Sequence, residues 1–383
     1  MHAIEKILAK NSGRAEVHTG EIVTAKVDFA EINDLYLQTV YSFYEMGGEK
    51  VWNRERAAFV FDHYAPCPEA GVIYPGMIVV ATDSHTTTHG AFGAMGTGCG
   101  ATDMATILMT GELWFRVPEI IEVRLDGEAQ KGVYPKDVIL EVLGRIRADG
   151  AVYKAIDFTG SYVEKLNVAG RMTICNMAVE MGAKTAYMQP NADVLNYVDK
   201  RAVRPYEVQF TDPDFQYEES YVFDVSKIEP NLACPSSVEN VHPLSEVVAN
   251  GPIKLNQGYI GSCTGGRVED IAIAAKILKG RHIPEYTRLI VVPASNEVMQ
   301  ECMKAGYIQD LMNAGATITT PGCGACLGAH EGILAPGEVC ITSTNRNFPG
   351  RMGSTEALMY LASPATVAAS MVNGCITDPR DFL

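Results

Sequence analysis

The sequence has no long hydrophobic run, and this absence argues against membrane-spanning helices. No apolar stretch approaches the about 20 residues that a helix needs to cross a bilayer. The N-terminal stretch MHAIEKILAK has the mixed charged and apolar spacing of an amphipathic helix rather than the apolar core of a signal peptide. These two absences predict a cytoplasmic protein.

Positive charge is also scarce. The chain has 31 Lys and Arg residues against 46 Asp and Glu residues, which gives a net charge of −15 and a pI near 5.0. A surface that binds nucleic acid needs clustered cations to neutralise phosphates, so this balance argues against a nucleic-acid partner. Acidic small molecules stay compatible with it, because two arginines can dominate the field of one pocket.

Nucleotide-binding signatures, low-complexity tracts and sustained internal repeats are absent as well. Gly93, Gly96, Gly98 and Gly100 superficially resemble a dinucleotide fingerprint, but the required strand and helix context is not evident around them. We therefore expect chemistry that needs no nucleotide.

The length and the residue pattern indicate several α/β domains. A chain of 383 residues is too long for one ordinary core and predicts two or three domains. Short apolar runs alternate with amphipathic stretches, which is typical of α/β architecture. We place boundaries near residues 118 and 240, which gives domains 1–118, 119–240 and 241–383.

The same pattern predicts individual elements. Strands are expected where apolar residues run between breakers, and helices where they recur at helical spacing. Pro135 is expected to begin a helix, because proline is favoured at the first helical position. The expected strands are Glu21–Ala30, Ala57–His63, Met77–His85 and Glu119–Glu128, the expected helices are Leu35–Gly47 and Pro135–Arg147, and Asn231–Pro243 is expected to be a linker.

Chemically reactive side chains occur where apolar strands are expected to stop. In open α/β sheets, ligands bind at the carboxyl ends of the strands. Separate strands are therefore expected to deliver these groups to one crevice. The groups are Asp62 with His63, Asp83 with Ser84 and His85, Cys263, and Cys323.

Three of the ten cysteines form a suggestive set. Cys323 and Cys326 have C-x-x-C spacing in the glycine-rich segment TPGCGACLGAH, and Cys263 stands where a strand leads into a helix. Three thiolates can hold three corners of a [4Fe–4S] cluster and leave one iron open as a Lewis acid. A redox pair, a zinc site with His330 as fourth ligand, and chance stay open from spacing alone.

Four segments together resemble the aconitase family, in the same order and over nearly the whole chain. The closest likeness is to the large subunits of 3-isopropylmalate dehydratase and homoaconitase of the archaeal-type branch. Agreement of independent motifs is specific for the family and says little about the substrate. The segments are DSHTTTHG (Asp83–Gly90), GSCTGGRVED (Gly261–Asp270), PGCGACLGAH (Pro321–His330) and TNRNFPGRMG (Thr344–Gly353).

The resemblance implies a three-domain α/β fold with mostly parallel sheets that lacks the family's mobile fourth, swivelling domain. It also implies a [4Fe–4S] cluster with three cysteine ligands and one open iron. Roles carry over onto matching positions. The implied metal ligands are Cys263, Cys323 and Cys326; the implied catalytic residues are Asp62, His63, Asp83, His85 and Glu180; and the implied substrate-binding residues are Ser84, Asn176, Asn345, Arg346 and Arg351.

The implied chemistry is sensible on general grounds. Hydroxide leaves poorly at neutral pH, and an open iron can bind it while a histidine protonates it. His63, supported by Asp62, is expected to take that part. Arg346 and Arg351 are expected to clamp carboxylates in fork geometry, which lysine does less well.

Each residue also has an ordinary structural interpretation. Asp62 and His63 alone are more often a capped turn, and Asp83 before a polar run can simply be an N-cap. Glu180 fits a solvated helix face, and Arg346 and Arg351 fit surface charges. These interpretations are reasonable one at a time, but not all together in the order of the family.

The resemblance implies an enzyme that dehydrates and rehydrates a small hydroxy-acid. The first choice is 3-isopropylmalate dehydratase of leucine biosynthesis, and homoaconitase, citramalate dehydratase and 2,3-dimethylmalate dehydratase are alternatives. The family's proton-abstracting serine lies on the absent fourth domain, so a separate small subunit is expected to supply it in a heterodimer or heterotetramer. The chain alone is expected to be inactive. A structural-metal or cluster-sensing binding protein is the non-enzyme alternative.

Two stretches depart from the family pattern. After Glu69 and Ala70, family members carry a few dozen more residues, including an active-site histidine. We expect that segment to be a disordered loop omitted from this sequence, and an intact mass of 41.5 kDa would contradict this. Residues Glu31–Thr39 (EINDLYLQT) replace the family's His-Asp pair, so the substrate is expected to be unusual.

Overall fold

The structure, a computed structural model, describes residues 1–34, 36–60 and 73–383. The chain divides into two compact units, each of which is described by itself. Unit 1 contains Met1–Asp126 and Asp149–Phe223, and unit 2 contains Gly127–Ala148 and Asp224–Leu383. A short segment from the first half of the chain therefore belongs to unit 2. The predicted division into three domains stays a prediction.

Unit 1 is built from two four-stranded sheets and a two-stranded antiparallel ribbon. Its strands are β1 (Ile22–Lys26), β2 (Phe29–Ile32), β3 (Ala57–Phe59), β4 (Ile78–Ala81), β5 (Met95–Gly98), β6 (Glu112–Arg116), β7 (Ile120–Asp126), β8 (Ala155–Thr159), β9 (Thr185–Tyr187) and β10 (Glu219–Asp224). Its helices are α1 (Ala3–Ser12), α2 (Tyr36–Glu45), the 3₁₀ helix η1 (Ser84–Phe92), α3 (Ala101–Thr110), α5 (Ser161–Lys165), α6 (Val168–Asn176), the 3₁₀ helix η2 (Met177–Met181) and α7 (Ala192–Asp199).

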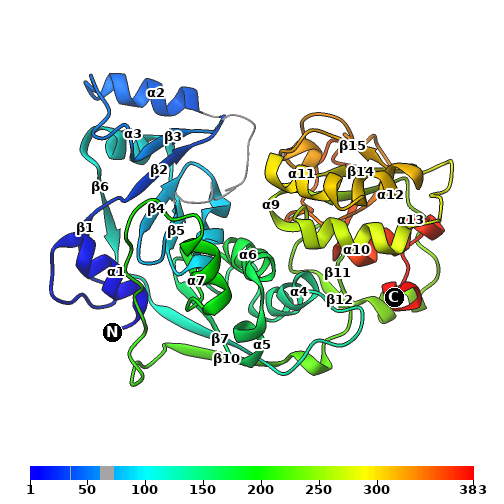
Figure 1. Cartoon of the computed structure of the whole chain (residues 1–383), viewed down its shortest axis with the longest axis horizontal. Coiled ribbons are helices and arrows are strands. Elements are labelled where there is room, and N and C mark those ends of the chain that lie inside the picture. The colour runs from blue at the N-terminus through cyan, green and yellow to red at the C-terminus, as the bar shows by residue number, and fades with distance from the viewer. Residues whose placement is uncertain (35, 61–72) are drawn as a thin grey trace. The chain divides into compact units, whose positions relative to one another are not determined.

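The first sheet of unit 1 is parallel and has the order β3-β2-β4-β5, and α2 packs against α3 beside it (Figure 1). All four residues of β4 are buried, and their side chains alternate between two cores. Ile78 and Val80 join the larger core with α1, while Val79 packs with Ile73 on the other face. Burial on both faces is what a central parallel strand requires, and it fixes where the following polar residues emerge.

Unit 2 is built around one seven-stranded sheet. Its strands are β11 (Asn231–Ala233), β12 (Val241–Pro243), β13 (Gln257–Gly261), β14 (Arg288–Val292), β15 (Thr317–Ile318), β16 (Val339–Thr342) and β17 (Leu358–Leu361). Its helices are α4 (Pro135–Ile146), η3 (Val225–Lys227), α8 (Leu244–Ala249), α9 (Ser262–Gly265), α10 (Val268–Leu278), α11 (Asn296–Lys304), α12 (Tyr307–Asn313), η4 (Gly324–Leu327), α13 (Pro364–Asn373) and η5 (Pro379–Phe382), of which η3, η4 and η5 are 3₁₀ helices.

The seven strands have the order β12-β11-β17-β16-β13-β14-β15, and the five from β17 to β15 are parallel. Alternation along these strands sends side chains to two different cores. Ile260, Val291 and Ile341 pack with the helices α10 and α13, whereas Tyr259 and Cys340 pack with residues of the loops after β15 and β16. One face of the sheet is therefore covered by helices, and the other supports the loop that carries Cys323 and Cys326.

Several predicted elements are confirmed. The helix predicted from Pro135 is α4, which begins at that proline and has Asp137 capping its first turn. The strand predicted at Glu119–Glu128 is β7, and the helix predicted at Leu35–Gly47 is α2. Mostly parallel sheets, predicted through the family resemblance, are present in both units.

Two predictions of local structure are wrong. The strand predicted at Glu21–Ala30 is two strands, because Asp28 breaks it and its side chain accepts from the backbone N–H of Ile78. The predicted linker Asn231–Pro243 is an antiparallel pair, β11 and β12, and its Asn231 is bonded to Asp137 of α4. The polar residues and prolines of this segment predict a linker. The strand pair forms because distant residues such as Asp137 bond to it, and local composition does not show this.

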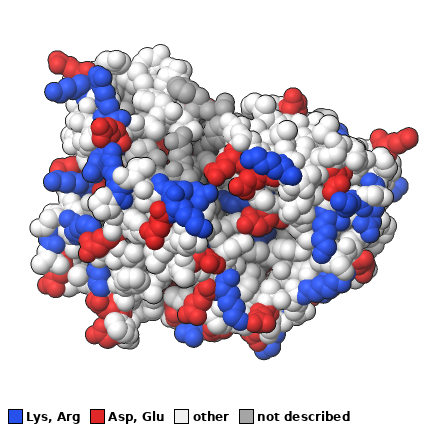
Figure 2. Space-filling view, in the orientation of Figure 1, with Lys and Arg blue, Asp and Glu red and all other residues white. Residues whose placement is uncertain are grey.

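Surface charge follows the acidic composition. On the face displayed in Figure 2, Lys and Arg side chains are interspersed with Asp and Glu. Ion pairs such as Arg204 with Glu55 at 3.1 Å and Lys10 with Glu207 at 2.9 Å join side chains of this kind. Within the described ranges, no helix is both long enough and apolar enough to cross a bilayer.

Candidate active site

In unit 1, the segment predicted to line a catalytic site begins directly after β4. Asp83 is the N-cap of η1, and its carboxylate accepts from the backbone N–H of His85 at 2.7 Å. The N-cap interpretation of Asp83 is thus correct as local structure. The cap holds the backbone so that the His85 side chain is buried and only 4% of the residue is exposed.

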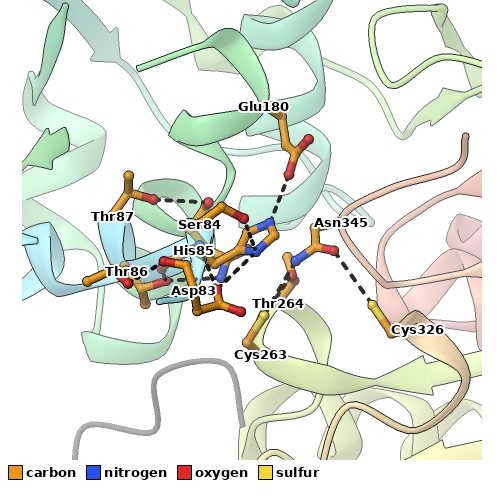
Figure 3. Close-up of polar contacts among 12 residues, drawn as sticks. Asp83, Ser84, His85, Thr86, Thr87, Glu180, Cys263, Thr264, Cys326 and Asn345 are labelled. Carbon is orange, nitrogen blue, oxygen red and sulfur yellow. Dashed lines mark hydrogen bonds and ion pairs between the residues drawn. The ribbon is translucent and has the colours of Figure 1, made fainter. Parts of the chain in front are cut away.

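His85 lies between two carboxylates. Its Nε2 is 2.8 Å from Glu180 Oε1, and its Nδ1 is 3.5 Å from Asp83 Oδ1 (Figure 3). Burial acts to lower the pKa of His85, but the hydrogen bonds and negative charges of Asp83 and Glu180 outweigh it, so the pKa is raised above its ordinary value. Asp83 and Glu180 therefore favour the protonated form of His85 despite its burial. Glu180 is buried, so its interpretation as a solvated helix face is wrong.

Asn176, at the end of α6, lies beside η1. Its side-chain Nδ2 donates to Thr88 Oγ1 at 3.0 Å, and its carbonyl accepts from Thr87 Oγ1 at 3.3 Å. The residue is fully buried. These contacts tie α6 to the helix that carries His85, and a substrate-binding role for Asn176 stays a prediction.

A cavity of about 480 Å³ opens in unit 1 at the carboxyl ends of β4 and β5. Ser84, Thr97, Cys99 and Lys184 contribute to its lining. Burial lowers the pKa of Lys184. Parallel sheets bind ligands at this end of their strands, so the location agrees with the predicted substrate role of Ser84.

In unit 2, Cys263 is the second residue of α9, which follows β13 directly. The residue before it, Ser262, has a φ of 64°, which is a strained left-handed conformation for a residue with a Cβ. Its hydroxyl oxygen is buried and has no hydrogen-bond partner in the described part of the chain. Cys263 is 7% exposed.

The side chain of Asn345 lies between two of the predicted cysteine ligands (Figure 3). Its Nδ2 is 3.4 Å from the Cys263 sulfur, and its Oδ1 accepts from the Cys326 thiol at 3.6 Å. Asn345 follows β16 and is 1% exposed. One buried amide therefore joins the loop that carries Cys263 to the loop that carries Cys326.

Tyr259 completes this group from β13. Its hydroxyl donates to the carbonyl of Cys323 at 2.8 Å. Burial raises the pKa of Tyr259, and the charges of Cys326, Cys323 and Cys263 add to the increase, so all three sulfurs lie within electrostatic range of one phenol. Gly324 has a φ of 55°, and a Cβ there would lie 2.7 Å from the tyrosine oxygen. This position thus needs glycine.

The two predicted arginines follow in the loop after β16. Arg351 has its Nη2 4.0 Å from the Cys326 sulfur, and its Nε is buried without a hydrogen-bond partner among the described residues. Arg346 is half-buried and next to Asn345. His330 is exposed, and in the described ranges no three His, Cys, Asp or Glu side chains are arranged to hold a single metal ion.

The residues present in unit 2 fit an iron–sulfur cluster. Cys263, Cys323 and Cys326 are free thiols, and each is less than a tenth exposed. Cysteine thiolates are the ligands of such clusters, and each binds a different iron, so they need not converge on one point. The unsatisfied hydroxyl of Ser262 beside Cys263 is consistent with a bound group there, because buried polar atoms nearly always have a partner.

Two predicted residues, Asp62 and His63, lie outside the described residues. The expectation that the unit 1 and unit 2 groups share one crevice also stays a prediction. Conversely, the structure brings in Tyr259, Thr88 and Lys136, which the sequence did not single out. Period-two alternation in GYIG marks Tyr259 as facing one side of the sheet, but its bond to Cys323 joins residues 64 apart in sequence.

Comparison with known proteins covers nearly the whole chain. The sequence profile of the aconitase family (aconitate hydratase) matches residues 63–374. The chain is 46% identical over 419 residues to 3-isopropylmalate dehydratase large subunit 1 of Methanopyrus kandleri, covering 99% of each chain. It is 44% identical over 421 residues to the probable methanogen homoaconitase large subunit of Methanothermobacter thermautotrophicus, covering 99% of this chain and 98% of that one.

One solved structure extends the comparison to the fold. The holo-form of Thermococcus kodakaraensis aconitase X superposes with a TM-score of 0.50 over 93% of this chain and 94% of that chain. The sequence identity is 10%, so the likeness concerns the fold alone. It agrees with the predicted aconitase-like architecture.

The alignment lengths also bear on the segment that was expected after Ala70. The 421 aligned positions against 383 residues leave at least 38 positions of the homoaconitase relative without a counterpart here. Whether residues after Ala70 are lacking from the protein or are omitted from this sequence stays a prediction.

The profile match and the identities of 44% and 46% agree with the four motifs and with the buried groups around His85 and Cys263. This chain belongs to the aconitase family.

Proposed function

We propose that this chain is the large subunit of an iron–sulfur hydro-lyase that isomerises a small hydroxy-acid by dehydration and rehydration. The observation that carries the proposal is the buried group in unit 2, where Cys263 and Cys326 contact one amide and the carbonyl of Cys323 accepts from the Tyr259 hydroxyl. A set of three thiols suits a [4Fe–4S] cluster with one iron left without a protein ligand.

The best choice of substrate is 3-isopropylmalate. Relatives named 3-isopropylmalate dehydratase large subunit support it, with identities of 46% and 42% over almost the whole chain. Homoaconitase is the second candidate, because a relative of that name is 44% identical. The difference between these identities is too small to separate the two. Some aligned positions of the homoaconitase relative have no counterpart here, and the Glu31–Thr39 segment is unusual. Citramalate and 2,3-dimethylmalate therefore stay among the substrates to be screened.

When bound, the cluster supplies a Lewis-acidic iron that stabilises the charge of a departing hydroxyl. The chain's own residues supply protons and orientation. His85, whose pKa is raised by its contacts with Glu180 and Asp83, is proposed to donate a proton to a substrate oxygen. Arg346 and Arg351 orient carboxylates through paired N–H groups. His63 and Asp62 keep their predicted role in protonating the leaving hydroxyl.

A separate small subunit is part of the proposal. The relatives carry the words large subunit in their names, which supports a partner of this kind. We propose that the partner supplies the proton-abstracting serine and that the two chains form a heterodimer or heterotetramer. Full turnover by the purified large subunit with a reconstituted cluster would refute this part.

The test is anaerobic reconstitution with iron and sulfide in the presence of candidate small subunits. Hydroxy-acids are then screened for the absorbance of the unsaturated intermediate. Serine variants of Cys263, Cys323 and Cys326 are expected to lose both the brown colour and turnover. The matched control is Cys340→Ser, which changes a buried free cysteine of β16 in the same unit and is expected to keep both.

Two results would favour the alternatives. Stoichiometric zinc in place of iron, with no turnover of any hydroxy-acid, would favour a structural-metal protein. A cluster that forms but neither turns over nor responds to substrates with any small subunit would favour a sensing or electron-transfer role.

A further inference from the structure

Lys136 is a buried cation in unit 2. It lies in the first turn of α4, and only 2% of the residue is exposed. Its Nζ donates to the backbone carbonyl of Thr344 at 2.6 Å. A buried ammonium group is costly unless its hydrogen bonds and charge are used, so this contact marks a specific arrangement rather than a surface lysine folded inward.

Thr344 connects this ammonium group to the cysteine site. Thr344 immediately precedes Asn345, whose side chain contacts the sulfurs of Cys263 and Cys326. The Thr344 carbonyl belongs to the peptide group that leads into Asn345, so the bond from Lys136 fixes the backbone on which that amide stands. Thr344 and Asn345 are both buried, which removes water as an alternative partner for the carbonyl.

A second buried cation makes a similar contact at the loop that carries Cys263. Arg267, the N-cap of α10, is 7% exposed and donates from Nη1 to the carbonyl of Thr264 at 3.3 Å. Thr264 follows Cys263. The loop of Asn345 and the loop of Cys263 are therefore each held through a backbone carbonyl by a buried positive side chain.

Two buried carboxyl groups lie near these cations. Burial raises the pKa of Asp137 to about 7 and that of Asp270 to about 6, while the charge of Lys136 acts to lower both. Both carboxyls also accept backbone N–H bonds that fix the helices α4 and α10. Removing the ammonium charge alone would leave this region with an excess of negative charge.

We propose that Lys136 is a positioning residue that raises the reduction potential of the cluster by placing a buried positive charge next to the Asn345 loop. This inference rests on the proposed function. Reduction adds one electron to the cluster, and a nearby cation stabilises the more negative state. Charge, burial and hydrogen bonds around the sulfurs are the means by which a protein tunes such clusters.

The test is a reduction titration of the reconstituted large subunit with dithionite, followed by electron paramagnetic resonance. Lys136→Met removes the charge and keeps the length of the side chain. The one-electron reduction equilibrium is expected to shift about tenfold toward the oxidised cluster, which corresponds to about 59 mV. Lys136→Arg keeps the charge and its donors and is expected to stay within about threefold of the unmodified chain.

Tyr259→Phe is the matched control. It removes another buried hydrogen bond to a backbone carbonyl of the site, from the hydroxyl to Cys323, without removing a positive charge. It is expected to change the equilibrium less than Lys136→Met does. Retention of a cluster by Lys136→Arg but not by Lys136→Met would equally support the role of the charge.

Three outcomes would overturn the inference. They are an unchanged potential in Lys136→Met, an equal shift in Tyr259→Phe, and loss of the cluster from both Lys136 variants. The failure of the proposed function is distinguishable from these, because the unmodified chain would then bind no cluster at all.

Discussion

At the scale of single residues, the clearest functional feature of unit 1 is a histidine whose charge is set by its neighbours. Burial alone would favour the neutral imidazole of His85, but Glu180 and Asp83 reverse that preference. The distance of 2.8 Å from His85 Nε2 to Glu180 is that of a strong charged hydrogen bond. The two carboxylates therefore favour a protonated imidazole at a position where burial alone would disfavour it.

Glu180→Gln is expected to weaken the fold by about 2 kcal/mol in a pH-dependent way. The pKa of His85 is raised above its ordinary value of 6.5 in the folded state. The stabilisation is therefore complete below pH 6.5 and is lost as the pH rises through the folded pKa. Denaturant unfolding at several pH values measures the difference between the variant and the unmodified chain, which is expected to be largest below pH 6.5.

The control for this variant is Glu219→Gln, which breaks an exposed pair with Lys154 at 2.7 Å. An exposed pair contributes less than about 1 kcal/mol, so little change is expected at any pH near 6.5. A stability difference for Glu180→Gln that grows as the pH rises would contradict a raised pKa of His85 in the folded state.

At the scale of elements, the packing of η1 on β9 decides where His85 sits. Gly90 of η1 lies so close to β9 that a Cβ at this position would be 2.2 Å from the carbonyl oxygen of Ala186. The obstacle is backbone, which cannot rotate away as a side chain can. Position 90 therefore needs a residue without a side chain if η1 is to pack against β9.

Gly90→Ala is expected to lower the free energy of unfolding by about 3 kcal/mol, because it overpacks a rigid contact. Gly100→Ser is the matched control in the same unit. Nothing lies within 4 Å of a Cβ at Gly100, and serine is a good N-cap for α3, so stability is expected to be kept or slightly raised. Thermal unfolding of both variants measures this, and equal melting temperatures would show that η1 docks differently.

Elements also show what can and cannot be predicted from the sequence. The start of α4 at Pro135 and the strand β7 follow from local rules, because proline position and apolar alternation act over a few residues. The pair of β11 and β12 does not, because Asn231 is held by Asp137, which is 94 residues earlier. Local composition contains no sign of such a partner.

The candidate site divides in the same way. The C-x-x-C spacing of Cys323 and Cys326 predicts that they are ligands, and the four motifs indicate the family. Lys136 and Tyr259 were not predicted, because one occupies a helical turn and the other a strand, and both are ordinary there. Their contacts with Thr344 and Cys323 join segments that only the tertiary fold brings together.

At the scale of the whole molecule, chain connectivity matters for the site. Gly127–Ala148 belongs to unit 2, although the chain returns to unit 1 at Asp149. This excursion delivers α4, and with it Lys136, to the sheet that carries the cysteines.

At least 38 aligned positions of the homoaconitase large subunit have no counterpart in this sequence. The motifs that contain His85 and the three predicted cysteine ligands are nevertheless present in this chain. The cluster chemistry is therefore expected to be that of the family, and the choice of substrate is where a difference is expected.

Mössbauer spectroscopy of the full chain, reconstituted anaerobically with iron-57 and its small subunit, tests most directly whether Cys263, Cys323 and Cys326 hold a cluster with one open iron. We predict that the substrate changes the spectrum of one iron in each cluster and leaves the others unchanged, because only that iron lacks a cysteine. A spectrum in which no iron responds to any hydroxy-acid, or a protein that binds zinc and no iron, would contradict the claim.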